Sequence, residues 1–139
     1  MRLTSLAKVD SKGRVTIPQT MREALDIEPG MVVVLIADLD KREITVSPVS
    51  ASLKDVYELE VELLDKPGAL AKLTQKLAEL GIDIIATRCA SIARGESGNC
   101  TLVVDLSRAK TDPEELRRQI EELDVVMLAK LKGFEAPVG

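Results

Sequence analysis

Apolar and polar residues alternate along several short stretches of the chain, and this period of two predicts β-strands. In residues 14–18, "RVTIP", two apolar residues alternate with Arg14 and Thr16, and Pro18 then ends the strand. The next nine residues, "QTMREALDI", carry apolar side chains at helical spacing. The first part of the chain is therefore predicted as a strand over 14–18, a helix over 19–27, a turn over 28–30, a strand over 31–37, a charged turn over 38–43 and a strand over 44–47 closed by Pro48.

The strand over residues 31–37, "MVVVLIA", is apolar on both of its faces. A segment of fewer than about 50 residues forms only a marginal core by itself. Both observations predict a dimer in which two chains build one core. The small and polar stretch that follows, "SPVSASLKD" over residues 47–55, predicts a linker.

A clear alternation opens the second part of the chain. Residues 56–64, "VYELEVELL", alternate apolar side chains with three glutamates, which predicts a half-buried strand with a solvated face. The solvated side chains are Glu58, Glu60 and Glu62. Arg88 and Arg94, on the next predicted strand, are candidates to pair with them.

Two stretches with leucines at helical spacing predict the helices of this second part. The first covers residues 69–81 and is capped by Gly81, and the second covers 111–123 and opens with Asp112 and a proline. The order is βαββαβ, typical of a ferredoxin-like arrangement with both helices on one face of an antiparallel sheet. The remaining strands are predicted over 82–93, 100–106 and 124–131.

The composition argues against most enzyme chemistry. The chain has no His, which removes the commonest general base and the commonest metal ligand, and it has only two Cys. No GxSxG, P-loop or GxGxxG motif occurs, so we expect a protein that is not an enzyme and holds no metal or cofactor. Cys89 and Cys100 are too few for a disulfide scaffold and are predicted to be reduced core thiols.

Neither an apolar run of about 18 residues nor an N-terminal apolar signal core is found. We therefore expect a cytoplasmic protein with no membrane partner. The net charge of −4 is uneven: residues 1–25 carry five Lys or Arg and two Asp or Glu, hence +3, whereas residues 49–139 carry twelve and sixteen, hence −4. A basic segment on an acidic protein can still contact phosphate, because screening limits distant charge to about 10 Å.

Residues 7–48 resemble the AbrB/SpoVT/MazE-type swapped-hairpin domain. The resemblance is carried by "AKVDSKGRVTIPQTMREALDIEPGMVVVLI", in which "GRVTIP", the "MREALDI" helix and a following Pro-Gly occur together. It implies a β-barrel formed by a dimer with interlocked hairpins, and in most members of the family DNA binding. The residues that it places at DNA are Lys8, Lys12, Arg14 and Arg22.

The chemistry of these residues fits contact with DNA. Gly13 allows a tight turn, Arg14 suits bidentate contact with guanine, and Lys8 and Lys12 suit phosphate. The same cations also fit a solvated strand edge, where Lys discourages aggregation. Ala7 and Glu23 stand where many DNA-binding members of the family carry a further cation.

Residues 56–133 resemble an ACT domain, mainly in "YELEVELLDKPGALAKLTQKLAELGIDI" with its Pro-Gly turn before the helix. The first amides of a helix attract a carboxylate, and a carboxylate at position 65 suits an α-ammonium. An ordinary strand-to-helix connection explains the turn equally well, and the Asn that many ligand-binding members carry near this turn or at position 83 is missing. The resemblance implies an amino-acid site, commonly between subunits, at Asp65, Gly68, Ala69, Leu70, Ile82 and Asp83. The predicted strand order would place Ile82 and Asp83 near the Pro-Gly turn.

The predicted organisation is an α+β chain with a swapped-hairpin domain over 1–48, a linker over 49–55, an ACT-like domain over 56–133 and a tail over 134–139. It predicts a transcription regulator that binds double-stranded DNA, senses an amino acid and associates with a second copy of itself. Two alternatives remain open: an antitoxin-type protein partner, and a regulatory subunit of an amino-acid biosynthetic enzyme.

Overall fold

The computed structural model describes residues 1–93 and 95–139 and confirms the predicted mixture of helices and strands. A two-stranded sheet comes from the first part of the chain and a four-stranded sheet from the second. Within the described ranges, none of the helices has the length and apolar character needed to cross a membrane. In chain order the elements are α1 Gln19–Ala24, β1 Val32–Asp38, β2 Glu43–Val49, the 3-10 turn η1 Leu53–Asp55, β3 Val56–Leu64, α2 Ala69–Glu79, β4 Asp83–Ala93, β5 Ser97–Asp105, α3 Pro113–Glu121 and β6 Val126–Gly133.

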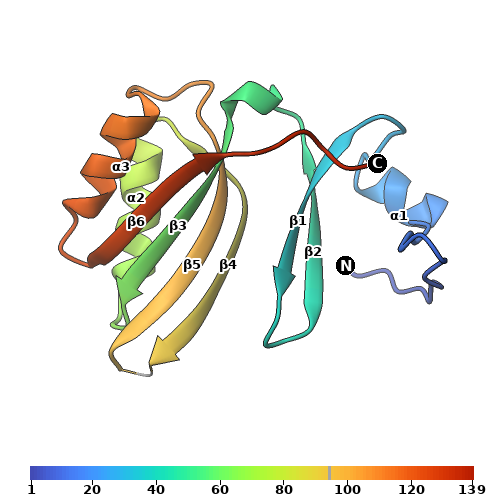
Figure 1. The fold of residues 1–139 in the computed structure, drawn as a ribbon, viewed down its shortest axis with the longest axis horizontal. Coiled ribbons are helices and arrows are strands. Elements are labelled where there is room, and N and C mark those ends of the chain that lie inside the picture. Colours follow the sequence, from blue (N-terminus) through green and yellow to red (C-terminus); the bar gives the residue numbers. More distant parts are fainter. Residues whose placement is uncertain (94) are drawn as a thin grey trace.

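The four-stranded sheet is antiparallel, with the strand order β4-β5-β3-β6. Its central strand β3 places Leu59 opposite Leu102 of β5 and Leu131 of β6. Helices α2 and α3 lie together on one face of this sheet (Figure 1). The predicted ferredoxin-like βαββαβ arrangement is therefore confirmed.

The main core lies between this sheet face and the two helices, and it confirms the predicted apolar stripes. The fully buried helix residues are Leu73, Leu77, Leu116 and Ile120. Leu70 belongs to the same leucine-spaced stretch, which was expected to be core, but its side chain is 42% exposed. In α2 the buried row begins at Ala69 and recurs every four residues, so Leu70 lies about 100° away around the helix.

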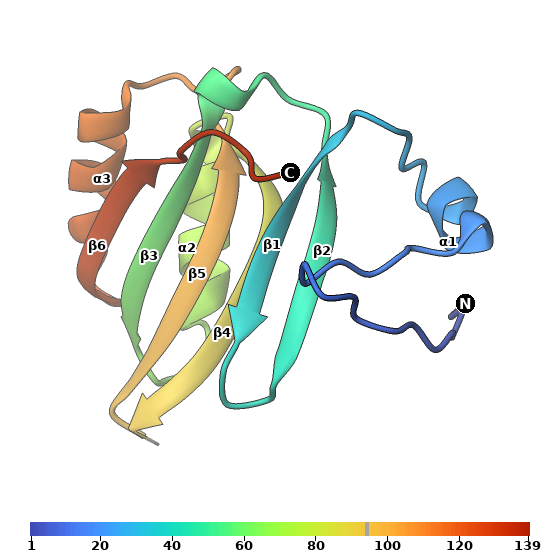
Figure 2. The same ribbon diagram turned by 45° about the vertical axis from the view of Figure 1, so that its right-hand side comes forward.

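The β1–β2 hairpin packs one face against the helix-free face of the four-stranded sheet (Figure 2). Val34 and Val49 of the hairpin share a second buried cluster with Val56, Ala86 and Val103 of the sheet. The two parts of the chain are thus joined by a common apolar contact as well as by the connecting segment.

The opposite face of the hairpin is exposed. Leu35 and Val46, which face each other across the hairpin, are 57% and 39% exposed, and Ile44 is 66% exposed. The chain's own sheet thus covers one apolar face of this run, and the other face stays exposed in the single chain. The interlocked dimer remains a prediction.

The predicted strand over residues 14–18 is wrong for the single chain, in which these residues belong to no strand. A strand needs a neighbour to accept and donate its backbone hydrogen bonds, and one chain supplies none here. The predicted helix over 19–27 is also too long. It ends at Ala24, with Asp26 in the left-handed conformation at φ 55° and the amide of Ile27 donating to the carbonyl of Arg22.

The prediction of two reduced thiols is also wrong, because Cys89 and Cys100 form a disulfide. The two residues are direct partners on the antiparallel strands β4 and β5, with their Cα atoms 4.1 Å apart. Side chains of directly opposite residues in such strands point to the same face, which brings the two sulfurs together. Sequence spacing alone does not show this register.

The predicted pairing of Arg88 with the glutamates of β3 is wrong, because β5 lies between β4 and β3. Its guanidinium instead contacts the hairpin. Glu58 pairs with Lys132 of the neighbouring strand β6 at 3.1 Å. The predicted pairing of Arg94 lies outside the described residues.

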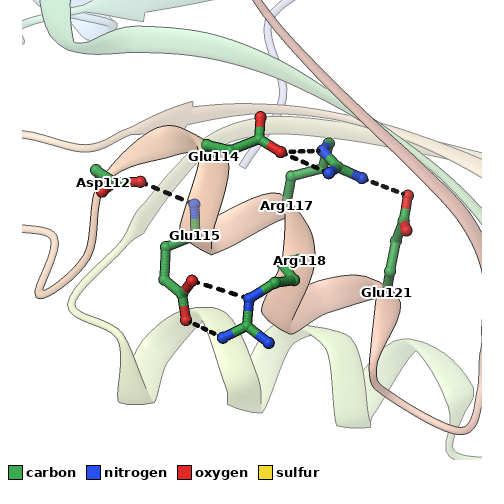
Figure 3. A network of polar contacts seen from close by, with 6 residues as sticks. All are labelled: Asp112, Glu114, Glu115, Arg117, Arg118 and Glu121. Carbon is green, nitrogen blue, oxygen red and sulfur yellow. Dashed lines mark hydrogen bonds and ion pairs between the residues drawn. The ribbon is translucent and has the colours of Figure 1, made fainter.

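Helix α3 begins as predicted, with the Asp112 side chain accepting a hydrogen bond from the amide of Glu115 at 2.8 Å (Figure 3). Its outer face carries ion pairs at spacings of three and four residues, including Arg117 with Glu114 and Glu121, and Arg118 with Glu115. These pairs raise the pKa of both arginines and lower the pKa of Glu115. Because these ion pairs join side chains on the outer face of a single helix, they indicate that this face is solvated.

Candidate functional site

The predicted DNA-contacting loop forms a tight turn over residues 10–14. The amide of Gly13 donates to the carbonyl of Asp10, and the amide of Asp10 donates to the carbonyl of Arg14, both at 3.0 Å. Gly13 has φ 78°, so the predicted need for a glycine in the turn is confirmed.

Asp10 organises this turn, a role that the sequence analysis missed. Its Oδ1 accepts the amides of Lys12 and Arg14 at 2.9 Å, and its Oδ2 accepts Nε of Arg14 at 2.7 Å. The backbone and side-chain hydrogen bonds from Arg14 hold the pKa of the Asp10 carboxyl below its usual range. The carboxylate is therefore charged at neutral pH, and it fixes one edge of the guanidinium that was predicted to read guanine. An Asp followed by a Gly three residues later is the signal that could have indicated it.

Arg22 has a structural partner as well as a predicted DNA role. It lies in the last turn of α1, and its Nε donates to the carbonyl of Ile17 at 2.9 Å. The guanidinium thus holds the chain that leads from the loop into the helix. Lys8 and Lys12 are exposed. Helix α1 and the residues before it lie on the side of the hairpin away from the four-stranded sheet (Figures 1 and 2).

At the second site, Asp65 is already engaged within the chain. Its Oδ2 accepts the amide of Gly95 at 2.8 Å, and its own amide donates to the carbonyl of Glu96 at 3.2 Å. Asp65 therefore ties the end of β3 to the turn between β4 and β5. The ammonium group of a bound amino acid would therefore have to share the Asp65 carboxylate with the amide of Gly95.

Gly68 opens α2 in the left-handed conformation at φ 84°. An added Cβ would meet no atom within 4 Å, so the glycine serves the backbone conformation and leaves the space in front of the turn open. Ala69 is buried and Leu70 is exposed beside it. No side chain caps the helix start, and the first amides of a helix have no partner within the helix. This turn therefore offers a place for a carboxylate.

The prediction that Ile82 and Asp83 lie beside this turn is wrong. Asp83 starts β4 and faces Asp105, which also faces Val56 at the start of β3, whereas Asp65 follows the end of β3. The nine residues of β3 separate the two ends of the sheet by about 30 Å. Ile82 belongs to the main core, and Asp83 pairs with Arg108 at 3.1 Å.

A groove of about 990 Å³ lies where the two parts of the chain meet, and the sequence analysis missed it. Residues 30–35, which lead into and begin β1, form one wall, and the segment 132–139, which starts with the last two residues of β6, forms another. The segment predicted as a tail thus borders the hairpin in the fold, with Phe134 49% exposed.

Comparison with known families agrees with this organisation. Residues 6–54 match the family described as antidote-toxin recognition MazE, bacterial antitoxin, and residues 57–124 match the ACT domain family. The chain thus carries a MazE-type domain followed by an ACT domain, which confirms both resemblances.

No curated protein matches the chain. Among solved structures, it is similar to the chemotaxis kinase CheA P2 domain in complex with the response regulator CheY from the thermophile Thermotoga maritima, at 17% identity and a TM-score of 0.41. That match covers 58% of this chain and 98% of the other. A likeness at this level carries no argument about function.

Proposed function

We propose that this protein is a transcription regulator that binds double-stranded DNA through its first domain and senses an amino acid through its ACT domain. The observation that supports this most is the placement of the basic loop. The chain before α1, which includes the turn over residues 10–14, lies on the side of the hairpin away from the ACT sheet (Figure 1), while the hairpin itself packs on that sheet. One side of the hairpin domain thus meets the sensor, and the loop on its far side is open to DNA.

A dimer would double the basic loop. The exposed apolar face of the hairpin, with Leu35, Ile44 and Val46, supplies a surface that a second copy would bury. Two copies carry eight of the predicted contact cations, enough to hold several phosphates. The acidic remainder of the chain would direct DNA toward this loop by repulsion elsewhere.

An antitoxin-type role is the second candidate, and the match of residues 6–54 to a MazE antitoxin family favours it. Here, however, the residues after the hairpin domain form a folded sheet domain that packs against it. A segment that wraps a toxin would need to be free, so we rank the DNA regulator first and propose that the chain is not an enzyme. Copurification of a small toxin with the full chain would reverse this ranking.

DNA binding is tested with labelled duplex from the region upstream of the protein's own gene, at several salt concentrations. Arg14→Ala is expected to weaken binding to this duplex by about 30-fold or more, because a bidentate base contact of about 1–3 kcal/mol is lost in each of two copies. Lys12→Ala is expected to lower the slope of log affinity against log salt by about two per dimer, since each copy loses one phosphate contact.

Lys130→Ala is the matched control, because it removes the same charge from exposed β6 of the ACT sheet. It is expected to leave both affinity and salt slope unchanged. Folded wild-type protein that shows no salt-dependent binding at low ionic strength would refute the DNA-binding proposal.

The amino-acid site is proposed to lie between two copies of the chain. The turn with Gly68 and the start of β4 with Asp83 lie at opposite ends of one sheet, too far apart for one small ligand. Strand β4 is an edge of that sheet. If two copies associate antiparallel along this edge, the Asp83 end of one copy meets the Gly68 end of the other.

A mixing experiment tests this arrangement. The twenty amino acids are screened singly against wild type by calorimetry, and the strongest is used with Gly68→Ala and Asp83→Ala proteins. Each variant alone should lose most of the binding. After unfolding and refolding of an equal mixture, about one quarter of the wild-type capacity should return, because half of the dimers are mixed and each regains one intact site. No recovery would refute the shared site between two copies, and no binding to wild type would refute amino-acid sensing.

A further inference from the structure

Arg88 of β4 makes polar contacts with the hairpin domain. Its Nε donates to the hydroxyl of Thr45 at 2.6 Å, and its terminal nitrogen lies 3.5 Å from a carboxylate oxygen of Glu43. Thr45 and Glu43 are two residues apart on β2, and therefore share one face of that strand. One guanidinium thus holds two successive side chains on the face of the hairpin turned toward the sheet.

The surroundings of Arg88 make this contact more than a surface ion pair. Its side chain is 32% exposed and lies next to the apolar cluster in which Val34 and Val49 meet Ala86 and Val103. The apolar cluster holds the two parts of the chain together but does not fix how one lies along the other, because the hydrophobic effect is non-directional. The hydrogen bond from Arg88 to Thr45 and its ion pair with Glu43 add the direction, because they fix where β2 lies along β4.

The strand that carries Arg88 is itself anchored. The next residue, Cys89, is covalently bonded to Cys100 of β5, which is an interior strand of the sheet. A displacement of β4 relative to β5 is therefore resisted directly beside Arg88. Any movement of β4 with the rest of the ACT sheet would be passed to the hairpin through this guanidinium.

We propose that Arg88 is a positioning residue that fixes the register of the DNA-binding hairpin on the ACT sheet through Thr45 and Glu43, and so couples the two domains. The coupling part of this inference rests on the proposed function, and the positioning part does not. Arginine suits the role because its planar fork reaches two acceptors at once, whereas the single ammonium of Lys cannot reproduce both contacts.

The test is hydrogen exchange of the full chain without DNA or amino acid, read at the amides of β2. Arg88→Ala and Thr45→Val are each expected to speed exchange of β2 about tenfold, because the hairpin leaves the sheet more often. Arg88→Lys should behave like Arg88→Ala, and Thr45→Ser should behave like wild type because it keeps the hydroxyl. Arg108→Ala is the matched control. It removes an ion pair to Asp83, which lies on β4 like Arg88, but it removes no contact with the hairpin.

Equal exchange of β2 in wild type and Arg88→Ala would overturn the proposal. Full rescue by Arg88→Lys would overturn it as well, because charge alone would then suffice. Exchange of β2 that is as fast in Arg108→Ala as in Arg88→Ala would overturn it too, because loss of any ion pair on β4 would then explain the effect.

A second arm adds the upstream duplex and reads residues 83–90 of β4. In wild type and Arg108→Ala, DNA should slow exchange in both β2 and β4, and in Arg88→Ala the slowing should stop at β2. Slowing of β4 in Arg88→Ala as large as in wild type would overturn the coupling. If wild type binds no duplex, the proposed function fails, and the first arm alone still decides whether Arg88 positions the hairpin.

Discussion

Gly81→Ala is expected to lower the free energy of unfolding by about 3 kcal/mol or more. Gly81 follows α2 in the left-handed conformation at φ 76°, and the amide of Ile82 donates to the carbonyl of Leu77 across it. A non-glycine residue in this conformation costs about 1–2 kcal/mol. In addition, a Cβ at this position would lie 2.5 Å from the carbonyl oxygen of Arg108. Overpacking of this kind costs a further 1–3 kcal/mol or so.

The carbonyl that a Cβ would meet has little room to retreat. Its loop is tied to the same helix end, since the amide of Lys110 donates to the carbonyl of Leu80 at 2.8 Å. Gly68→Ala is the matched control, because Gly68 has a similar φ of 84° and open space around an added Cβ. Denaturant unfolding should give a loss of about 1–2 kcal/mol for the control, the conformational cost alone. Equal losses for the two variants would show that the Arg108 loop yields and that the steric contribution is absent.

Leu73→Ala is expected to lower the free energy of unfolding by about 2–5 kcal/mol, because it removes a fully buried side chain from the main core. Leu73 lies in α2 among the residues that pack on the ACT sheet. A loss of this size is a large share of the 5–15 kcal/mol or so that is typical of folded proteins.

Leu70→Ala is the control for this prediction, since it makes the same change in the same helix at a side chain that is 42% exposed. It should cost less than about 1 kcal/mol. Chemical denaturation of the three proteins at equal concentration measures both values. A loss for Leu70→Ala as large as for Leu73→Ala would mean that Leu70 is covered in solution, which a second copy at the proposed ligand site would explain.

The local elements of the ACT domain were predictable because their signals are local. Alternation in residues 56–64, leucine spacing in the helices and the stop at Gly81 each depend on residues close together in the sequence. The strand predicted over 14–18 does not form in the single chain, where these residues pair with no other strand. A strand pattern predicts a surface suited to pairing, and the partner decides whether a strand forms.

The candidate sites were predicted with uneven success for the same reason. Lys8, Lys12 and Arg14 belong to one loop because they are neighbours in sequence. The role of Asp10 was also local and could have been found from the turn pattern. The placement of Asp83 beside the Pro-Gly turn failed because it depends on strand direction, which carries the chain away from that turn along the whole sheet.

The sequence by itself determined the two domains, the order of their elements, the basic loop and the apolar stripes that form the main core. Each of these follows from composition or from a period that repeats within about ten residues. The tertiary structure alone decided that Cys89 meets Cys100, that Arg88 reaches Thr45 and Glu43, and that the hairpin covers one face of the ACT sheet. These contacts depend on strand order and register, which are set by how distant segments bury their apolar faces together.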